Sequence, residues 1–166
     1  MNQRTKTALM WALFAVLFLF VLLLQTLLFG RARFFGVKLN LIPVVIVCVC
    51  LWVGHEAGGL FGLIAGFCWF LTGADDGALS IVTFTVCGIL ASWLCMNVFP
   101  RRFGSALLLC LGALLLHEGV LFLLKYYLED AALSLALWVP VTAGLSALGS
   151  PVIYLLAKAI GKAGGN

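Results

Sequence analysis

The sequence predicts an all-α integral membrane protein with about six transmembrane helices, and three observations lead to this prediction. Hydrophobic residues make up 64% of the 166 residues and charged residues only 10%, whereas a soluble domain is roughly half apolar and a quarter charged. The mean hydropathy is +1.21. Long apolar runs are separated by short segments rich in charge, glycine or proline. Because a helical span needs about 20 residues, the chain is expected to form one membrane domain over residues 1–166, without a separate soluble domain.

The expected spans follow these apolar runs. The first run is the least interrupted, and it is too long for a signal-peptide core, so we expect it to be retained. The second run has Pro43 in its first turn, where the missing amide costs least, and it is expected to extend to Ala57 in order to cross. The expected spans are residues 8–29, 41–57, 58–73, 78–99, 105–124 and 136–160.

The last apolar run, from Ala131 to Ile160, is too long for one upright span. Two prolines suggest how it is divided. The preferred interpretation is a re-entrant or interfacial piece up to Trp138, followed by a span from Pro140 that is kinked near Pro151. The alternative is one long, tilted and kinked helix.

The distribution of lysine and arginine predicts the orientation. With six spans, both termini lie on one side of the membrane. That side holds six of the ten basic residues and the other side holds four, so the positive-inside rule places both termini in the cytoplasm. The six are Arg4, Lys6, Arg101, Arg102, Lys158 and Lys162, and the four are Arg31, Arg33, Lys38 and Lys125.

The net charge and the cysteines exclude two classes of function. A net charge of +4 is too small and too dispersed for a nucleic-acid-binding surface. All six cysteines lie in apolar runs, where cysteine behaves as a small hydrophobic residue. Cys48 and Cys50 are separated by one residue, unlike the usual metal or redox pairs. We therefore expect the cysteines to be packing residues.

A stripe of small residues, Gly58, Gly62 and Gly66, is the first candidate for an interaction surface. Small residues four apart line one side of a helix and let another backbone approach closely in lipid. They are expected to form a helix-packing face or a partner contact. The two acids that follow, Asp75 and Asp76, lie in a glycine-bounded turn and are most simply solvated loop charges.

Glu118 is expected to be the most deeply placed ionisable group, well inside the fifth span. A charge within the bilayer is costly and is a functional candidate by default. One interpretation is a structural polar anchor between helices, paired with Lys125, His117 or a neighbouring helix. The others are a proton or cation relay and a contact for a partner or ligand.

Neither His-Glu pair completes a catalytic motif. A zinc-protease helix has a second histidine four residues after the first, but Gly59 follows His55 at that offset and Leu121 follows His117. Phosphate-binding glycine loops and nucleophile turns are also missing from the sequence. We therefore expect no enzymatic activity, no metal and no cofactor.

Several segments, taken in order, resemble the MreD family of bacterial rod-shape-determining membrane proteins. They cover nearly the whole chain, although Phe70 stands where the family pattern has another glycine. The segments are residues 35–43 at the entry to the second span, the glycine-rich 58–67 with an acid at Asp75 or Asp76, the basic pair Arg101 and Arg102, and the closing segment 137–154 with Pro140 and Pro151.

The resemblance implies a non-catalytic protein of the bacterial plasma membrane that takes part in cell elongation. Such a protein binds MreC and links the cytoskeleton to a RodA-type glycosyltransferase and its transpeptidase. The family fold is similar to the six-helix substrate-binding subunits of energy-coupling-factor vitamin transporters. That similarity supplies a second hypothesis, in which Ala8 and Ala12 belong to a stripe that contacts an energising partner. Whether the chain forms a homodimer is left open.

Overall fold

The computed structural model describes residues 3–29, 38–73, 77–129 and 133–164, and every regular element in these ranges is helical. Asp75 and Asp76 lie outside the described residues, as do residues 35–37 of the segment at residues 35–43. In chain order the elements are α1 (Gln3–Leu24), the π-helix η1 (Gln25–Phe29), α2 (Ile42–Cys50), α3 (His55–Leu71), α4 (Leu79–Asn97), α5 (Phe103–Glu129), the 3-10 helix η2 (Leu133–Leu137), α6 (Trp138–Ala147) and α7 (Ser150–Ala163).

Three helical stretches are long and apolar enough to cross a membrane: Gln3–Phe29, Leu79–Asn97 and Phe103–Leu128. A fourth crossing results if Leu133–Ala147 and Ser150–Ala163 are counted as one broken span, which bends by 46°. The prediction of an all-helical protein with apolar, membrane-length helices is confirmed. The number of six spans stays a prediction.

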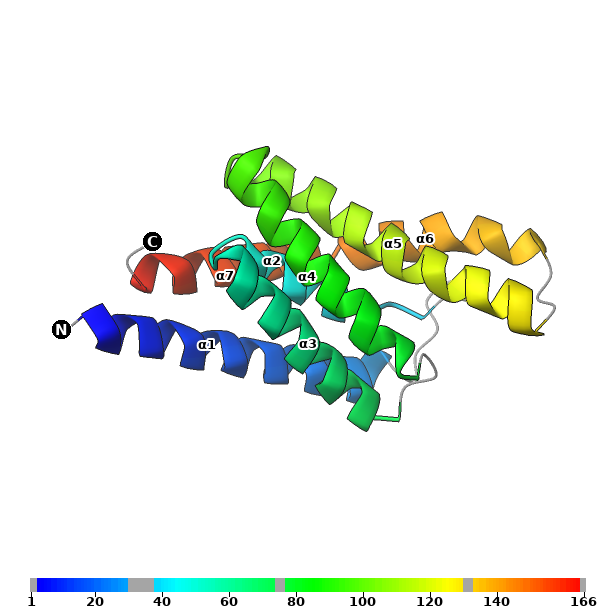
Figure 1. Ribbon diagram of the computed structural model, residues 1–166, viewed down its shortest axis with the longest axis horizontal. Helices are drawn as coiled ribbons and strands as arrows, with labels where there is room; N and C mark the ends of the chain where they lie inside the picture. The colour runs from blue at the N-terminus through cyan, green and yellow to red at the C-terminus, as the bar shows by residue number, and fades with distance from the viewer. Residues whose placement is uncertain (1–2, 30–37, 74–76, 130–132, 165–166) are drawn as a thin grey trace.

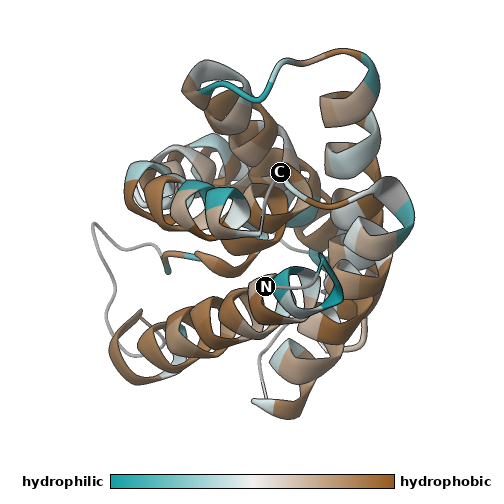
Figure 2. Cartoon of the chain, turned by 90° about the vertical axis from the view of Figure 1, so that its left-hand side faces the viewer, coloured by the Kyte–Doolittle hydropathy of each residue, from teal (hydrophilic) through white to brown (hydrophobic). Residues whose placement is uncertain are grey.

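The helices run back and forth along one long axis (Figure 1). The start of α1 and the end of α7 lie together, and a side chain added at Gly164 would meet Met10. We call this the terminal end of the bundle; the α4–α5 connection lies there too. Viewed from the terminal end, most of each helix is hydrophobic and the hydrophilic stretches are short (Figure 2).

The second predicted span is much shorter than expected. α2 ends at Cys50 and does not continue to Ala57. Its 9 residues extend over roughly 13 Å at 1.5 Å per residue, far less than the ~30 Å hydrocarbon core. Gly54 follows the turn in an extended conformation (φ −68°, ψ 166°) and is the N-cap of α3, a position at which glycine is tolerated.

α2 forms the centre of the bundle. Its residues are all buried, and it contacts α1, α3, α4, α5 and α7. A helix that is apolar on every side has no face for a polar environment and is stable only when surrounded. The core is therefore built around α2.

The carboxy-terminal segment is divided at the predicted positions. The 3-10 helix η2 precedes α6, which has Pro140, an exposed residue, in its first turn. The helix breaks at Leu148 and Gly149, and Pro151 occupies the first turn of α7. The bend near Pro151 is confirmed, whereas η2 runs directly into α6 as one helical stretch, Leu133–Ala147. A re-entrant or interfacial piece before Trp138 stays a prediction.

Candidate functional site

The glycines of α3 form the face that receives α4. A Cβ atom added to Gly66 would lie 2.7 Å from the Cα atom of Ile81, and one added to Gly62 would overlap the carbonyl group of Phe84. These neighbours are backbone atoms, which cannot rotate away as a side chain could. The two helices therefore touch backbone to backbone, as predicted for a packing face.

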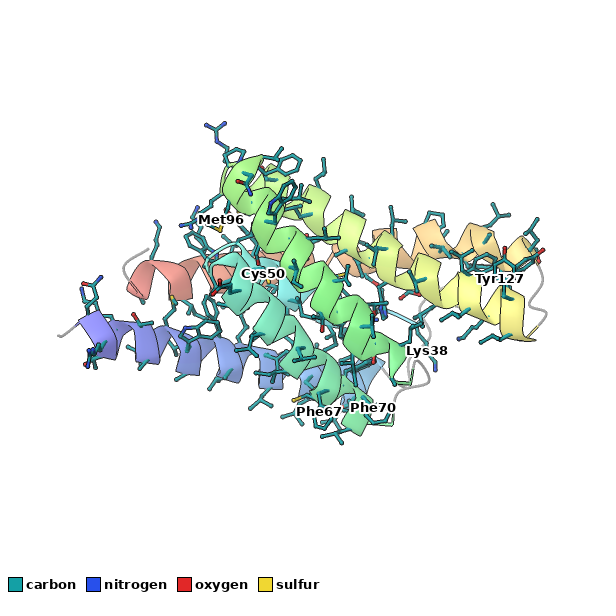
Figure 3. All side chains as sticks on the ribbon, viewed as in Figure 1. Lys38, Cys50, Phe67, Phe70, Met96 and Tyr127 are labelled. Atoms are coloured by element: carbon teal, nitrogen blue, oxygen red, sulfur yellow. The ribbon has the colours of Figure 1, made fainter. Side chains whose placement is uncertain are left out.

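Gly58 continues this contact towards α2. A Cβ atom added to Gly88 of α4 would overlap the Gly58 carbonyl group, and one added to Gly58 would overlap the Ser92 hydroxyl group. The Cys50 thiol lies 3.7 Å from the Gly58 carbonyl oxygen, in the interior of the bundle (Figure 3). Of the two functions expected for the glycine stripe, the structure therefore assigns it to packing within the chain.

The side of α3 opposite the glycines is apolar and exposed. Phe67 on this side is 52% exposed. Phe70, one turn after Gly66, is 41% exposed, and both side chains project away from the bundle (Figure 3). Trp69, one residue earlier than Phe70, is 9% exposed. The departure from the family pattern at Phe70 thus falls at an exposed position, one turn beyond the contacts that Gly62 and Gly66 make with α4.

His117, rather than Glu118, is the more deeply buried member of the second His-Glu pair. His117 is 0% exposed, whereas Glu118 is partly exposed. Adjacent residues on a helix project about 100° apart, so only one of the pair can point into the core. The expectation that Glu118 is the deepest ionisable group was wrong.

The imidazole of His117 joins α5 to α4. Its Nδ1 atom lies 2.9 Å from the Thr83 hydroxyl oxygen, and its ring centroid lies 4.6 Å from that of Phe84. Thr83 also donates to a carbonyl oxygen one turn earlier in α4. A buried polar group is tolerated when it is hydrogen-bonded. These contacts make His117 and Thr83 a polar anchor between α5 and α4.

A second buried polar cluster fixes the entry to α2, and it was not predicted from the sequence. The amide side chain of Gln25 accepts a hydrogen bond from Leu41 N–H at 3.0 Å and donates to the Leu39 carbonyl oxygen. The Asn40 N–H donates to the Ser146 hydroxyl oxygen at 3.0 Å. Gln25 is the first residue of η1 and is buried. The cluster connects α1, α2 and α6.

The arrangement of reactive side chains offers little chemistry in the described part of the chain. No three His, Cys, Asp or Glu side chains in that part lie close enough to hold a metal ion. All six cysteines are free thiols; five are buried and Cys68 is partly exposed, in agreement with their expected packing role. The serine and threonine hydroxyls mostly bond to carbonyl oxygens of their own helices, as Ser92 does to Gly88 at 2.7 Å.

These features define an all-helical protein with three or four apolar helices able to span a membrane, held together by backbone contacts at glycine and by buried hydrogen bonds. Comparison with protein-family models, with curated proteins and with solved structures found no match.

Proposed function

We propose that this chain is a non-catalytic scaffold of the MreD type in the bacterial plasma membrane. It binds an MreC-like protein and links the cell-elongation machinery to a RodA-type glycosyltransferase and its transpeptidase. The main support is that the small and polar side chains inside the bundle make contacts between helices. Gly62 and Gly66 contact the backbone of α4. His117 and Ser146 form hydrogen bonds to other segments of the chain. These groups therefore join helices and do not surround a reacting molecule.

The outer surface of the bundle suits contacts with other membrane helices. Large apolar side chains project from several helices, among them Phe20 at 59% exposure, Leu71 at 68% and Trp93 at 52%. In lipid, such surfaces associate through packing rather than through hydrophobicity. A rigid core with an apolar exterior is what a membrane scaffold requires.

Six crossings with both termini in the cytoplasm belong to the same proposal. The connections alternate between the terminal end and the opposite end (Figure 1). Arg101 and Lys158 lie at the terminal end. Lys38 and Tyr127 lie towards the other end (Figure 3), where Tyr127, 76% exposed, fits an interfacial aromatic belt. In this arrangement α2 is a half-length crossing.

The test is purification of the tagged protein from its own membranes, combined with depletion of the protein from cells. We expect an MreC-like protein or a RodA-type glycosyltransferase to co-purify, and we expect depleted cells to become round or wide. Normal shape together with loss of uptake of a single vitamin would contradict the scaffold function.

The second candidate is a substrate-binding subunit of an energy-coupling-factor transporter. One observation favours it: Ala8, Ala12 and Ala15 are all exposed on α1 and form a shallow stripe that another helix could approach. Replacing Ala12 with Leu would then block capture of an ATPase-containing partner. For the scaffold, the same replacement leaves recovery of the MreC-like protein unchanged if α1 faces lipid.

A further inference from the structure

A cavity of about 480 Å³ lies between the α4–α5 connection and α7, at the terminal end of the bundle. Cavities of this size accommodate one small ligand or headgroup. Basic and aromatic side chains dominate its lining: Arg101, Arg102, Phe103, Tyr154, Leu155 and Lys158.

Aromatic contacts hold two of the three cations in place. The Arg101 guanidinium group lies 5.7 Å from the ring centroid of Trp52, and Lys158 Nζ lies 5.9 Å from that of Tyr154, both within cation–π range. Trp52 itself rests against Gly161, where an added Cβ atom would lie 2.5 Å from its ring. These contacts set the positions of the charges before any ligand arrives.

The two walls of the cavity are also joined directly. The ring of Phe103 meets that of Tyr154 edge to face, with centroids 5.5 Å apart, and the Tyr154 hydroxyl group donates to the Arg101 carbonyl oxygen at 3.5 Å. The α4–α5 connection is thereby tied to α7. The packing of the fold therefore fixes the shape of the cavity.

The charge in the cavity is of one sign. Arg101, Arg102 and Lys158 line it, no carboxylate does, and none of the three forms an ion pair within the described residues. The first turn of α5 begins at Phe103 and has no acidic residue, so its amide groups and the positive end of its dipole add to the field. Three unneutralised cations at a helix N-terminus form an anion site.

The rest of the cavity and its surroundings are apolar. Leu155 lines the cavity and is 63% exposed, and beside it on α7 Val152 is 64% and Leu156 45% exposed. A free anion would gain nothing from this hydrocarbon surface. An amphiphile would place its charged group among the cations and its chains along α7.

We propose that this cavity binds the phosphate headgroup of an anionic phospholipid, with the acyl chains lying along α7. Basic pockets between membrane helices recognise such headgroups through the same combination of charge and interfacial position. This proposal does not depend on the proposed function.

The experiment measures lipid binding to the full-length protein in non-ionic detergent by native mass spectrometry. Phosphatidylglycerol is titrated against phosphatidylcholine, which carries the same acyl chains and a zwitterionic headgroup. The test variant combines Arg102→Gln with Lys158→Gln; Arg101 is left in place because it packs on Trp52. The matched control combines Arg4→Gln with Lys162→Gln, which removes two exposed cations of the same end outside the cavity.

We expect wild-type protein to prefer phosphatidylglycerol, and the test variant to bind it about tenfold or more weakly, since each basic group near an anionic surface contributes several-fold. The control should stay within about twofold, and Arg102→Lys with Lys158→Arg should retain binding, because these exchanges keep the charge. If the double variant fails to fold, Lys158→Gln alone decides, and unchanged affinity in it overturns the proposal.

Several other results would overturn it. Equal affinity of wild-type protein for the two lipids would show that the cavity does not distinguish the anionic from the zwitterionic headgroup. An equal loss in the control would assign binding to the diffuse charge of the surface. Displacement of the lipid by millimolar inorganic phosphate would identify a free-phosphate site. Displacement by an acidic peptide would identify a protein partner.

Discussion

The glycine contact between α3 and α4 is a place where one added methyl group should lower stability. An alanine at Gly66 would put its Cβ atom 2.7 Å from the Cα atom of Ile81. Carbon atoms prefer about 3.5–4.0 Å, so α3 and α4 would have to separate by about 1 Å. At Gly62 the obstacle is the Phe84 carbonyl group, with the next atom, Thr85 Cα, at 3.2 Å. We expect the double variant Gly62→Ala with Gly66→Ala to be destabilised.

The magnitude follows from two opposing effects. Overpacking costs typically about 1–3 kcal/mol per site, while replacing glycine by alanine inside a helix gains up to ~1 kcal/mol. For two sites the net loss is about 2 kcal/mol, if the costs add. For a chain of 150–250 residues, each 1 kcal/mol corresponds to about 2–4 °C, so the midpoint of thermal unfolding should fall by about 4–8 °C.

The assay is thermal unfolding in detergent, followed by the loss of the monodisperse peak of a fluorescent fusion in size-exclusion chromatography. The matched control is Gly112→Ala with Gly119→Ala in α5, because no atom lies within 4 Å of a Cβ atom added at either position. The control should leave the midpoint unchanged or raise it by a few degrees. Equal shifts of the same sign in the two double variants would refute the argument that backbone contact requires glycine in α3.

Three further substitutions probe polar groups: two are at buried residues and use the same assay, and one is at the partly exposed Glu118 and also uses co-purification. Thr83→Val removes the hydroxyl group 2.9 Å from His117 Nδ1 and should lower stability by about 1–3 kcal/mol. Thr85→Val loses only a bond to its own helix and should lower stability less. Equal losses would show that the contact with His117 is not what makes Thr83 important for stability. Ser146→Ala deprives the buried Asn40 N–H of its acceptor and should lower stability by about 1–3 kcal/mol; a wild-type midpoint would show that this bond is not needed. Glu118→Gln should keep the fold and the recovery of the MreC-like protein, because the amide retains hydrogen-bonding atoms; loss of recovery with normal stability would show that the charge is required.

The parts of the fold that were predictable depend on local sequence. α4 ends and α5 begins within two residues of the predicted limits, because Pro100 and the following arginines interrupt the apolar run. The glycine face could be predicted because a spacing of four residues by itself places Gly62 and Gly66 on one side of a helix. The same spacing did not predict which helix packs against that face. In the structure this helix is α4.

The length of α2 could not be predicted from its composition. A short apolar run looks the same whether it begins a membrane span or forms a buried helix. The expectation that the run extends to Ala57 relied on the thickness of the bilayer and gave too little weight to Gly54. Glycine at the N-cap followed by Glu56 in the first turn is a recognised start signal for a helix.

The buried polar contacts depend on residues far apart in the chain. Ser146 bonds to Asn40, 106 positions earlier, and His117 bonds to Thr83, 34 positions earlier. No periodicity links such positions, so the sequence pointed to Glu118 as the deep residue although its neighbour is the buried one. The cavity at the terminal end also depends on residues far apart in the sequence, because it forms only when α7 packs beside Arg101.

The position of α2 has a consequence for the order in which the protein is made. Its nine residues are enclosed by helices on both sides of it in the sequence, including α5 and α7. If segments are released into the membrane one after another, Ile42–Cys50 gains its contacts with α7 only after Ser150–Ala163 has been synthesised. We therefore expect a chain truncated before α7 to expose part of the surface of α2 that the complete bundle covers.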